Sequence, residues 1–238
     1  MERSMKSFKK NWIIIFTGLI YSIINIMMII ILSTFFKGVL FILTGFIMAI
    51  VSSSLISNYL YLLFNIINQD NITMDNFKEG FKYFLWKIYG IFFIAWIGNY
   101  LFSILTTNIR IDSISLARMI SIIILVALNP LPETIYQKYY SPFESIQYAF
   151  EFMKENCFNW ILPNALLYFL LYLVTNSLLT NIFGIYLTFS LNFSVKSILS
   201  YFLGQALFSF TMIYRGHLFK ILSTSTRRKR MYMDRFYK

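Results

Sequence analysis

Charged side chains are scarce in this chain and make up only 13% of its 238 residues. A typical soluble domain carries about 25% charged residues, so an ordinary water-exposed surface is excluded for most of the chain. Hydrophobic residues make up 58%. The composition therefore predicts that nearly all of the chain lies in lipid or inside a helical bundle.

Residues that serve metal, redox and nucleophilic chemistry are also few. Cys157 is the only cysteine, so no intramolecular disulfide can form, and His217 is the only histidine. A zinc or iron site needs several His, Cys or carboxylate ligands. The chain has no Gly-rich phosphate loop and no Gly-x-Ser-x-Gly motif. We therefore expect neither a cofactor nor an enzymatic activity. An intramembrane enzyme that uses His217 or Glu133 is the least favoured alternative.

Basic residues outnumber acidic ones by 21 to 10, which gives a net charge of +11. Their positions argue against nucleic acid as a partner, because they lie near the chain ends and in alternate loops, as membrane topology requires. The tail 223–238 contains the cluster Arg227, Arg228, Lys229 and Arg230. We expect this cluster to contact anionic lipid headgroups, at about 1 kcal/mol per basic residue.

Long uncharged runs predict membrane-spanning helices, because about 20 apolar residues cross a bilayer. The predicted spans are 12–32, 39–67, 88–105, 119–132, a span within 156–180, and 197–214. The fourth is the shortest, and Pro130 and Pro132 should break its end. The chain is thus predicted to be all-α, a single polytopic membrane domain over residues 1–238.

The segment 182–195 could be a seventh span or a re-entrant or interfacial segment. Six spans place 17 of the 21 Lys and Arg residues on one side, whereas a seventh would move the basic tail to the other. The positive-inside rule favours six spans with both termini cytoplasmic. We therefore expect the protein to be located in a cell membrane. Heavy use of Ile, Phe, Tyr, Asn and Lys suggests a bacterial source.

The stretch 141–160 has the pattern of a one-sided amphipathic helix that leads into a membrane span. Ser141 is placed as an N-cap, Pro142 as the first helical residue, and Glu144 as the partner in a capping box. The expected apolar face consists of Phe143, Ile146, Ala149, Phe150, Met153 and Cys157.

A weaker copy of this pattern lies 69 residues earlier, at 72–91. We therefore predict a parallel internal repeat, with units at about 39–105 and 114–180, each containing one cytoplasmic amphipathic helix. Two helices on one side of the membrane could dock a partner protein such as a transporter ATPase. The expected docking residues are Phe77, Phe81, Ile146 and Phe150.

Polar residues inside the predicted spans can line a pathway, but they more often form hydrogen bonds between helices. They are Asn25, Asn99, Asn164, Asn176, Gln205 and the serines at 52–54 and 57. Gly45 and Ala49 form a small-xxx-small pair, which favours close helix packing. Glu133 and His217 are expected at the membrane interface, and Glu151 with Glu155 on a solvated helix face.

Two short motifs carry a family resemblance. They are Phe77-Lys78-Glu79-Gly80-Phe81-Lys82 and the helix from Ala149 to Met153-Lys154. Here the chain, over about residues 40–215, resembles an uncharacterised family of bacterial six-span integral membrane proteins, similar to the membrane domain attached to some glycerophosphodiester phosphodiesterases. The resemblance implies a six-span helical fold and supplies no catalytic residues. The pattern differs at Glu155, where a small residue is usual.

Two functions remain open at this point. The favoured one is a non-enzymatic multi-pass membrane protein that acts as a scaffold, a lipid-binding protein or an envelope factor. The alternative is a permease-type subunit that works with a separate ATPase.

Overall fold

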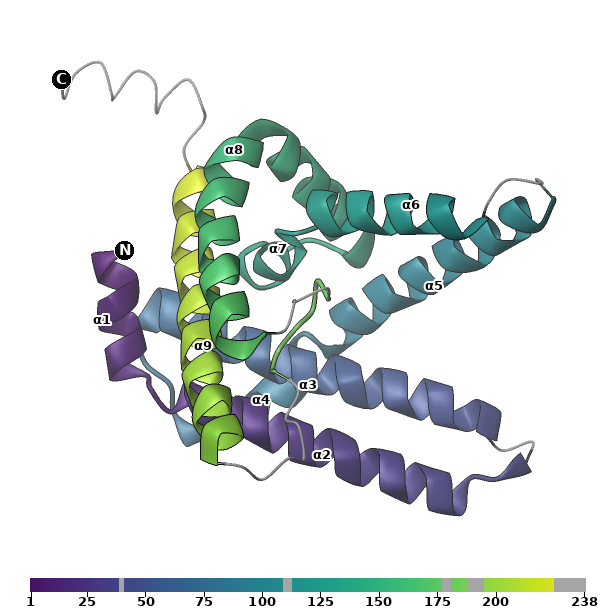
Figure 1. Ribbon diagram of the computed structural model, residues 1–238, viewed down its shortest axis with the longest axis horizontal. Coiled ribbons are helices and arrows are strands. Elements are labelled where there is room, and N and C mark those ends of the chain that lie inside the picture. The colour runs from purple at the N-terminus through teal and green to yellow at the C-terminus, as the bar shows by residue number, and fades with distance from the viewer. Residues whose placement is uncertain (39–40, 109–112, 177–180, 188–194, 225–238) are drawn as a thin grey trace.

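A computed structural model describes residues 1–38, 41–108, 113–176, 181–187 and 195–224 (Figure 1). Throughout these residues the regular secondary structure is α-helical. The helices are α1 (Glu2–Lys10), α2 (Ile14–Phe35), α3 (Phe41–Gln69), α4 (Met74–Tyr83), α5 (Leu85–Asn108), α6 (Ser113–Ala127), α7 (Leu131–Gln137), α8 (Pro142–Thr175) and α9 (Val195–Thr224). The all-α prediction is confirmed.

Six segments in this described part are long and apolar enough to cross a membrane, which confirms the predicted number of candidate spans. They are Ile14–Phe35, Leu43–Gln69, Met74–Ile104, Ala117–Gln137, Pro142–Thr175 and Val195–Thr224. Their presence indicates a multi-pass membrane protein. The last helix continues ten residues beyond the predicted end at 214, so Arg215 and His217 lie within α9.

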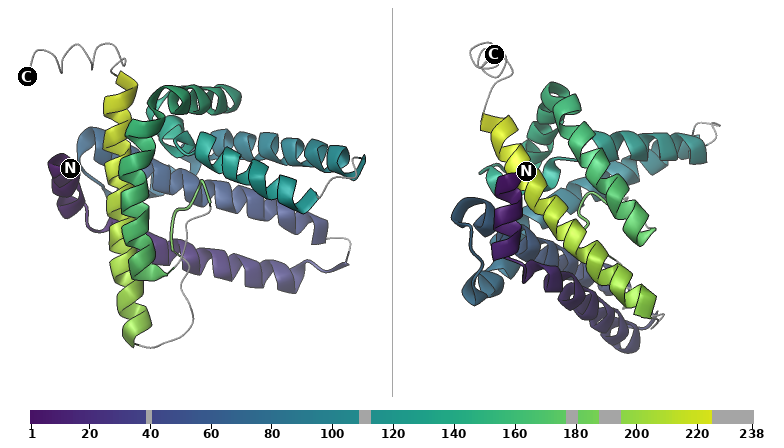
Figure 2. Two further views of the ribbon diagram at one scale, coloured as in Figure 1. Left: turned by 45° about the horizontal axis from the view of Figure 1, so that its top comes forward. Right: turned by 60° about the vertical axis from the view of Figure 1, so that its left-hand side comes forward.

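Helices α2 and α3 form an antiparallel hairpin. Helices α5 and α6 run in opposite directions and form a V that opens toward the bundle. Both pairs extend in the same direction, and α9 with the second half of α8 runs across their base (Figures 1 and 2). Gly38, with a φ of 62°, lies between α2 and α3 and adopts a left-handed conformation that glycine tolerates. It confirms the turn expected after the first span.

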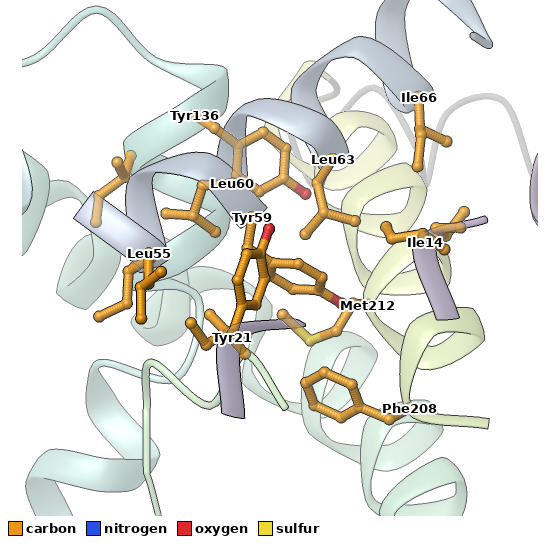
Figure 3. Close-up of a cluster of buried hydrophobic side chains, with 14 of the residues drawn as sticks. Ile14, Tyr21, Leu55, Tyr59, Leu60, Leu63, Ile66, Tyr136, Phe208 and Met212 are labelled. Atoms are coloured by element: carbon orange, nitrogen blue, oxygen red, sulfur yellow. The ribbon is translucent and has the colours of Figure 1, made fainter. Parts of the chain in front are cut away.

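The short helix α7 is the centre of the bundle, and every residue from Leu131 to Tyr136 is buried. It contacts α3, α8 and α9. Around it, Tyr21, Tyr59 and Met212 bring α2, α3 and α9 together in the main apolar core (Figure 3). Lys87 of α5 donates hydrogen bonds to the carbonyls of Ile135 and Lys138, at 3.0 and 2.9 Å. A cation thus caps the end of α7, where helix carbonyls lack partners.

Helix α4 packs closely along α3 through small and hydroxylated side chains. Ser54 Oγ donates to the Phe81 carbonyl at 2.9 Å, and Ser57 Oγ donates to the Gly80 carbonyl at 2.6 Å. A Cβ atom on Gly80 would lie 3.1 Å from the Cα of Asn58. The interhelical role predicted for serines 54 and 57 is therefore confirmed.

Helix α8 begins at the predicted capping box, in which Ser141 Oγ accepts from the Glu144 amide and Glu144 accepts from the Ser141 amide. It leads into the apolar half across a kink at Asn156, which has non-helical backbone angles (Figure 1). Pro163 lies in the second half, where it removes one helix hydrogen bond.

Helix α4 also starts at a capping box, formed by Thr73 and Asn76. The two boxes are one residue out of register with the 69-residue offset of the sequence copies, although Gly80 and Ala149, which that offset aligns, are both buried. The internal repeat and the amphipathic character of the two helices remain predictions.

Between α8 and α9 the chain is irregular over the described residues 181–187, and this stretch is packed inside the bundle. Ile185 and Leu187 belong to the main core, and the Leu187 amide donates to Gln205 Oε1 at 3.2 Å. Irregular backbone at membrane depth is tolerated where protein covers it. The rest of the predicted re-entrant segment, 188–194, lies outside the described residues.

Candidate functional site

A buried ion pair joins α7 to α9 at the middle of the bundle. Glu133 is fully buried, and the Arg215 side chain is 3% exposed. Arg215 Nε donates to Glu133 Oε1 at 2.7 Å, and Nη2 donates to Oε2 at 2.9 Å. This bidentate geometry is the strongest form of the arginine–carboxylate contact. Because the two charges cancel, the site has no net charge.

The remaining faces of the guanidinium are also enclosed. Arg215 Nη2 donates to the Asn129 carbonyl at 2.7 Å, and Nη1 donates to the Tyr168 hydroxyl. The rings of Trp160 and Tyr168 lie 5.2 and 5.7 Å from the guanidinium carbon, within the range of cation–π attraction. Trp160 is held in turn by a 2.8 Å hydrogen bond from its Nε1 to Asn129 Oδ1.

The Asn129-Pro130 break between α6 and α7 makes this arrangement possible. Residues 128–130 form a turn, so the Asn129 carbonyl is available to Arg215 outside a regular helix. The predicted break near Pro130 is thus confirmed, and it contributes directly to the site.

A cavity of about 190 Å³, called here the polar cavity, lies beside the ion pair. Its lining comes from α6, the α6–α7 turn, α8, the 181–187 segment and α9: Leu125, Val126, Asn129, Ile161, Asn164, Ala165, Tyr168, Asn181, Ile182, Gly184, Phe208, Met212 and Arg215. Asn164 is 2% exposed, and its Nδ2 donates to the Trp160 carbonyl at 2.8 Å. Its Oδ1 has no hydrogen-bond partner among the described residues.

Two sequence-based expectations about titratable residues are wrong. Glu133 is not an interfacial anchor, because it is fully buried and paired with Arg215. His217 does not lie at a helix end, because α9 continues to Thr224, and its side chain is 6% exposed and lies 3.3 Å from Ser7 Oγ of α1. Its position at the membrane interface stays a prediction. By contrast, Glu151 and Glu155 are exposed, as expected of a solvated face. Among the described residues, no group of three or more His, Cys, Asp or Glu could hold a metal ion.

The polar residues predicted within spans have different roles. Asn25 Nδ2 donates to Tyr186 Oη at 2.6 Å, and Gln205 Oε1 accepts from the Leu187 amide, so each joins a helix to the irregular 181–187 segment and not, as predicted, to another helix. Asn176 instead ends α8 in a left-handed conformation, and Asn99 is exposed on α5. Of these predicted polar residues, Asn164 is the one that lines the polar cavity, and its Oδ1 has no partner in the described part of the chain.

A second hollow, called here the apolar groove, lies between α3 and α5 and has a volume of about 570 Å³. It is lined by Gly45, Phe46, Ala49, Tyr89, Phe92, Phe93 and Trp96. No charged side chain belongs to this lining. A Cβ atom on Gly45 would meet nothing within 4 Å, so the predicted close packing at Gly45 is wrong for the described part of the chain.

The predicted docking residues fall into two groups. Phe77, Phe81 and Ile146 pack against the main core, whereas Phe150 is 56% exposed. The predicted lipid contacts Arg227, Arg228, Lys229 and Arg230 lie outside the described residues.

Comparisons with known proteins add no relative. No protein-family model matches this chain, and no curated protein and no solved structure was found to be similar to it.

Proposed function

We propose that this chain is a non-enzymatic membrane protein that binds the hydrocarbon tail of a lipid in the apolar groove. The observation that carries the proposal is the groove itself. Its volume of about 570 Å³ lies within the roughly 300–1,000 Å³ of ordinary ligand sites, which are lined mainly by apolar and aromatic side chains.

The position of the groove favours a lipid tail over a soluble ligand. Both α3 and α5 belong to candidate spans, so an inserted groove opens toward the hydrocarbon of the bilayer. Gly45 and Ala49 have small side chains and leave space on the α3 side of the groove. The side chains of Phe46 and Trp96, which also line it, are 58% and 63% exposed. Each buried methylene contributes about 0.8 kcal/mol when it leaves water. That gain is absent within lipid, so selectivity for a tail must come from its fit between these walls.

Filling the groove tests the proposal. Gly45→Leu adds a side chain where nothing lies within 4 Å, so the fold should accept it while the groove narrows. Gly98→Leu is the matched control, because Gly98 of α5 is equally unobstructed and does not line the groove. A phospholipid with a diazirine on its tail, incorporated in vesicles with the purified protein, should label peptides 43–50 and 86–97.

The expected result is a loss of that labelling in Gly45→Leu and its retention in Gly98→Leu. Equal labelling in the two variants would refute the tail site. A monomer–dimer shift in Gly45→Leu, with no change in labelling, would show that a second copy covers the groove instead.

We also propose that both termini are cytoplasmic, in line with the charge distribution. Helix α1 packs against α9, where the Phe8 and Phe210 rings lie 5.9 Å apart, and this contact supports a common side for the chain ends. With Cys157 replaced by serine, Lys229→Cys should resist a membrane-impermeant maleimide added to intact cells. Rapid labelling there would place the tail outside.

A permease-type subunit is the second candidate. It is favoured by Phe143 and Phe150, two large apolar side chains seven residues apart on α8 that are 66% and 56% exposed. A partner ATPase that copurifies in fixed stoichiometry from native membranes, and is lost on Phe150→Glu, would establish this role. Retention of the ATPase by Phe150→Glu would rule out this docking surface.

A further inference from the structure

The polar cavity offers hydrogen-bonding groups that the protein itself does not use. The guanidinium of Arg215 has five N–H groups, and acceptors among the described residues account for four of them, leaving one on Nη1. The Tyr168 hydroxyl accepts from Arg215 Nη1 and, as a phenol, can also donate its own proton. Asn164 Oδ1, which is buried, lacks a donor.

These unused groups include both hydrogen-bond donors and a hydrogen-bond acceptor. Tyr168 and Arg215 can donate, and Asn164 can accept, all within one cavity lining. A hydroxyl group matches this combination, because a single oxygen atom both accepts and donates hydrogen bonds.

Charge and size narrow the ligand further. The Glu133–Arg215 pair is neutral as a unit, so nothing in the described lining would compensate a charged ligand, and burying an unpaired charge is very costly. The cavity, at about 190 Å³, is smaller than sites for drug-sized ligands. Seven of its thirteen lining residues are Leu, Val, Ile, Ala, Phe or Met.

We propose that the polar cavity binds the hydroxyl group of an uncharged alcohol with an apolar body. The hydroxyl lies between Asn164 and Tyr168, and the apolar part lies against side chains of α6 and α9. The alcohol is either a small free molecule or the head of a neutral lipid. This site is separate from the apolar groove, and its proposal does not rest on tail binding there.

Photolabelling with matched probes tests this assignment on the full-length protein in vesicles. The probes are a diazirine derivative of hexanol, the same derivative of hexadecanol, and a diazirine fatty acid as the charged control. At least one alcohol should label the peptide 161–168, and the acid should not. Labelling by hexanol alone identifies a free alcohol, whereas labelling by hexadecanol identifies a lipid head.

Asn164→Leu removes the acceptor at similar side-chain size and should reduce this labelling about tenfold, as expected for one buried hydrogen bond. Asn99→Leu, an exposed asparagine of α5 outside the cavity, is the matched control and should label as the natural protein does. Ala165→Phe fills the cavity while all its polar groups remain, and it should also abolish labelling.

Three results would overturn the proposal. The first is equal labelling of the natural protein and Asn164→Leu. The second is labelling by the fatty acid as strong as that by the alcohols. The third is no labelling of 161–168 by either alcohol, and this third result would mean that the cavity holds water only. If Asn164→Leu fails to fold, Ala165→Phe alone decides between binding and water.

Discussion

Breaking the Glu133–Arg215 pair should be far more damaging than removing it completely. Glu133→Leu leaves the guanidinium with the Asn129 carbonyl, the Tyr168 hydroxyl and two aromatic rings, but without a counter-charge. The two lost hydrogen bonds involve charged groups, each contributing about 1.5–3 kcal/mol. We therefore expect a loss of about 3–5 kcal/mol in the free energy of unfolding, as found for other broken buried pairs.

The double variant Glu133→Leu with Arg215→Met should be close to the natural protein in stability. Replacing a whole buried ion pair by apolar side chains is often neutral or stabilising. The coupling energy from the four proteins should thus be about 2 kcal/mol or more. Ordinary hydrogen bonds between membrane helices average only about 0.6 kcal/mol in such double-mutant cycles. The measured coupling energy therefore distinguishes a buried ion pair from an ordinary hydrogen bond.

The measurement is reversible unfolding in mixed micelles, followed by tryptophan fluorescence, to which Trp160 beside the guanidinium contributes. The exposed Lys6–Glu2 pair of α1 provides the matched control, with side chains 75% and 86% exposed. Glu2→Leu should change stability by less than about 1 kcal/mol. A coupling of 0.6 kcal/mol or less, or a double variant as unstable as either single one, would refute the reasoning.

Three further predictions concern stability in the same assay. Gly80→Ala should lower the free energy of unfolding by about 1–3 kcal/mol, because its Cβ would lie 3.1 Å from a backbone Cα of α3. The control Gly98→Ala has open space around it and should not lower stability. Equal losses in the two variants would contradict the close α3–α4 contact. Lys87→Met should lower the free energy of unfolding by about 2 kcal/mol, because it removes the cation that caps α7. The control Lys154→Met, at an exposed position, should leave it almost unchanged. A Lys87→Met variant as stable as the natural protein would refute the capping role. Asn164→Leu should change stability by less than about 1 kcal/mol when no alcohol is present. It removes an unpartnered buried acceptor but also the hydrogen bond from Nδ2 to the Trp160 carbonyl, and the two effects oppose each other. A loss of more than about 3 kcal/mol would contradict this balance.

Local signals in the sequence were sufficient for much of the fold. The capping box at Ser141, the break at Pro130 and the glycine turn at Gly38 depend on neighbouring residues, and the structure contains all three. The number of candidate spans followed from uncharged runs, which depend on composition alone. The bend at Asn156 has no such local signal, because asparagine is common inside and at the ends of helices without bending them.

The candidate site was harder to predict because it depends on residues far apart in the chain. Glu133 and Arg215 are separated by 82 positions, and each has an ordinary local explanation at a helix end. The useful signal was their opposite charge near two apolar runs, since ionisable residues within membrane spans usually pair. The polar cavity and the apolar groove could not be predicted, because a hollow depends on how side chains from several helices fill the space between them.

The separation of the paired charges also constrains how the molecule is made. Glu133 leaves the ribosome 82 residues before Arg215, a delay of roughly 4–16 s at ordinary rates of synthesis. During that time α7 carries an acidic side chain that has no counter-charge and is costly to place in hydrocarbon. The fourth candidate span should therefore stay beside the insertion machinery until α9 arrives. A nascent chain that ends before residue 215 should be recognised as incomplete and degraded.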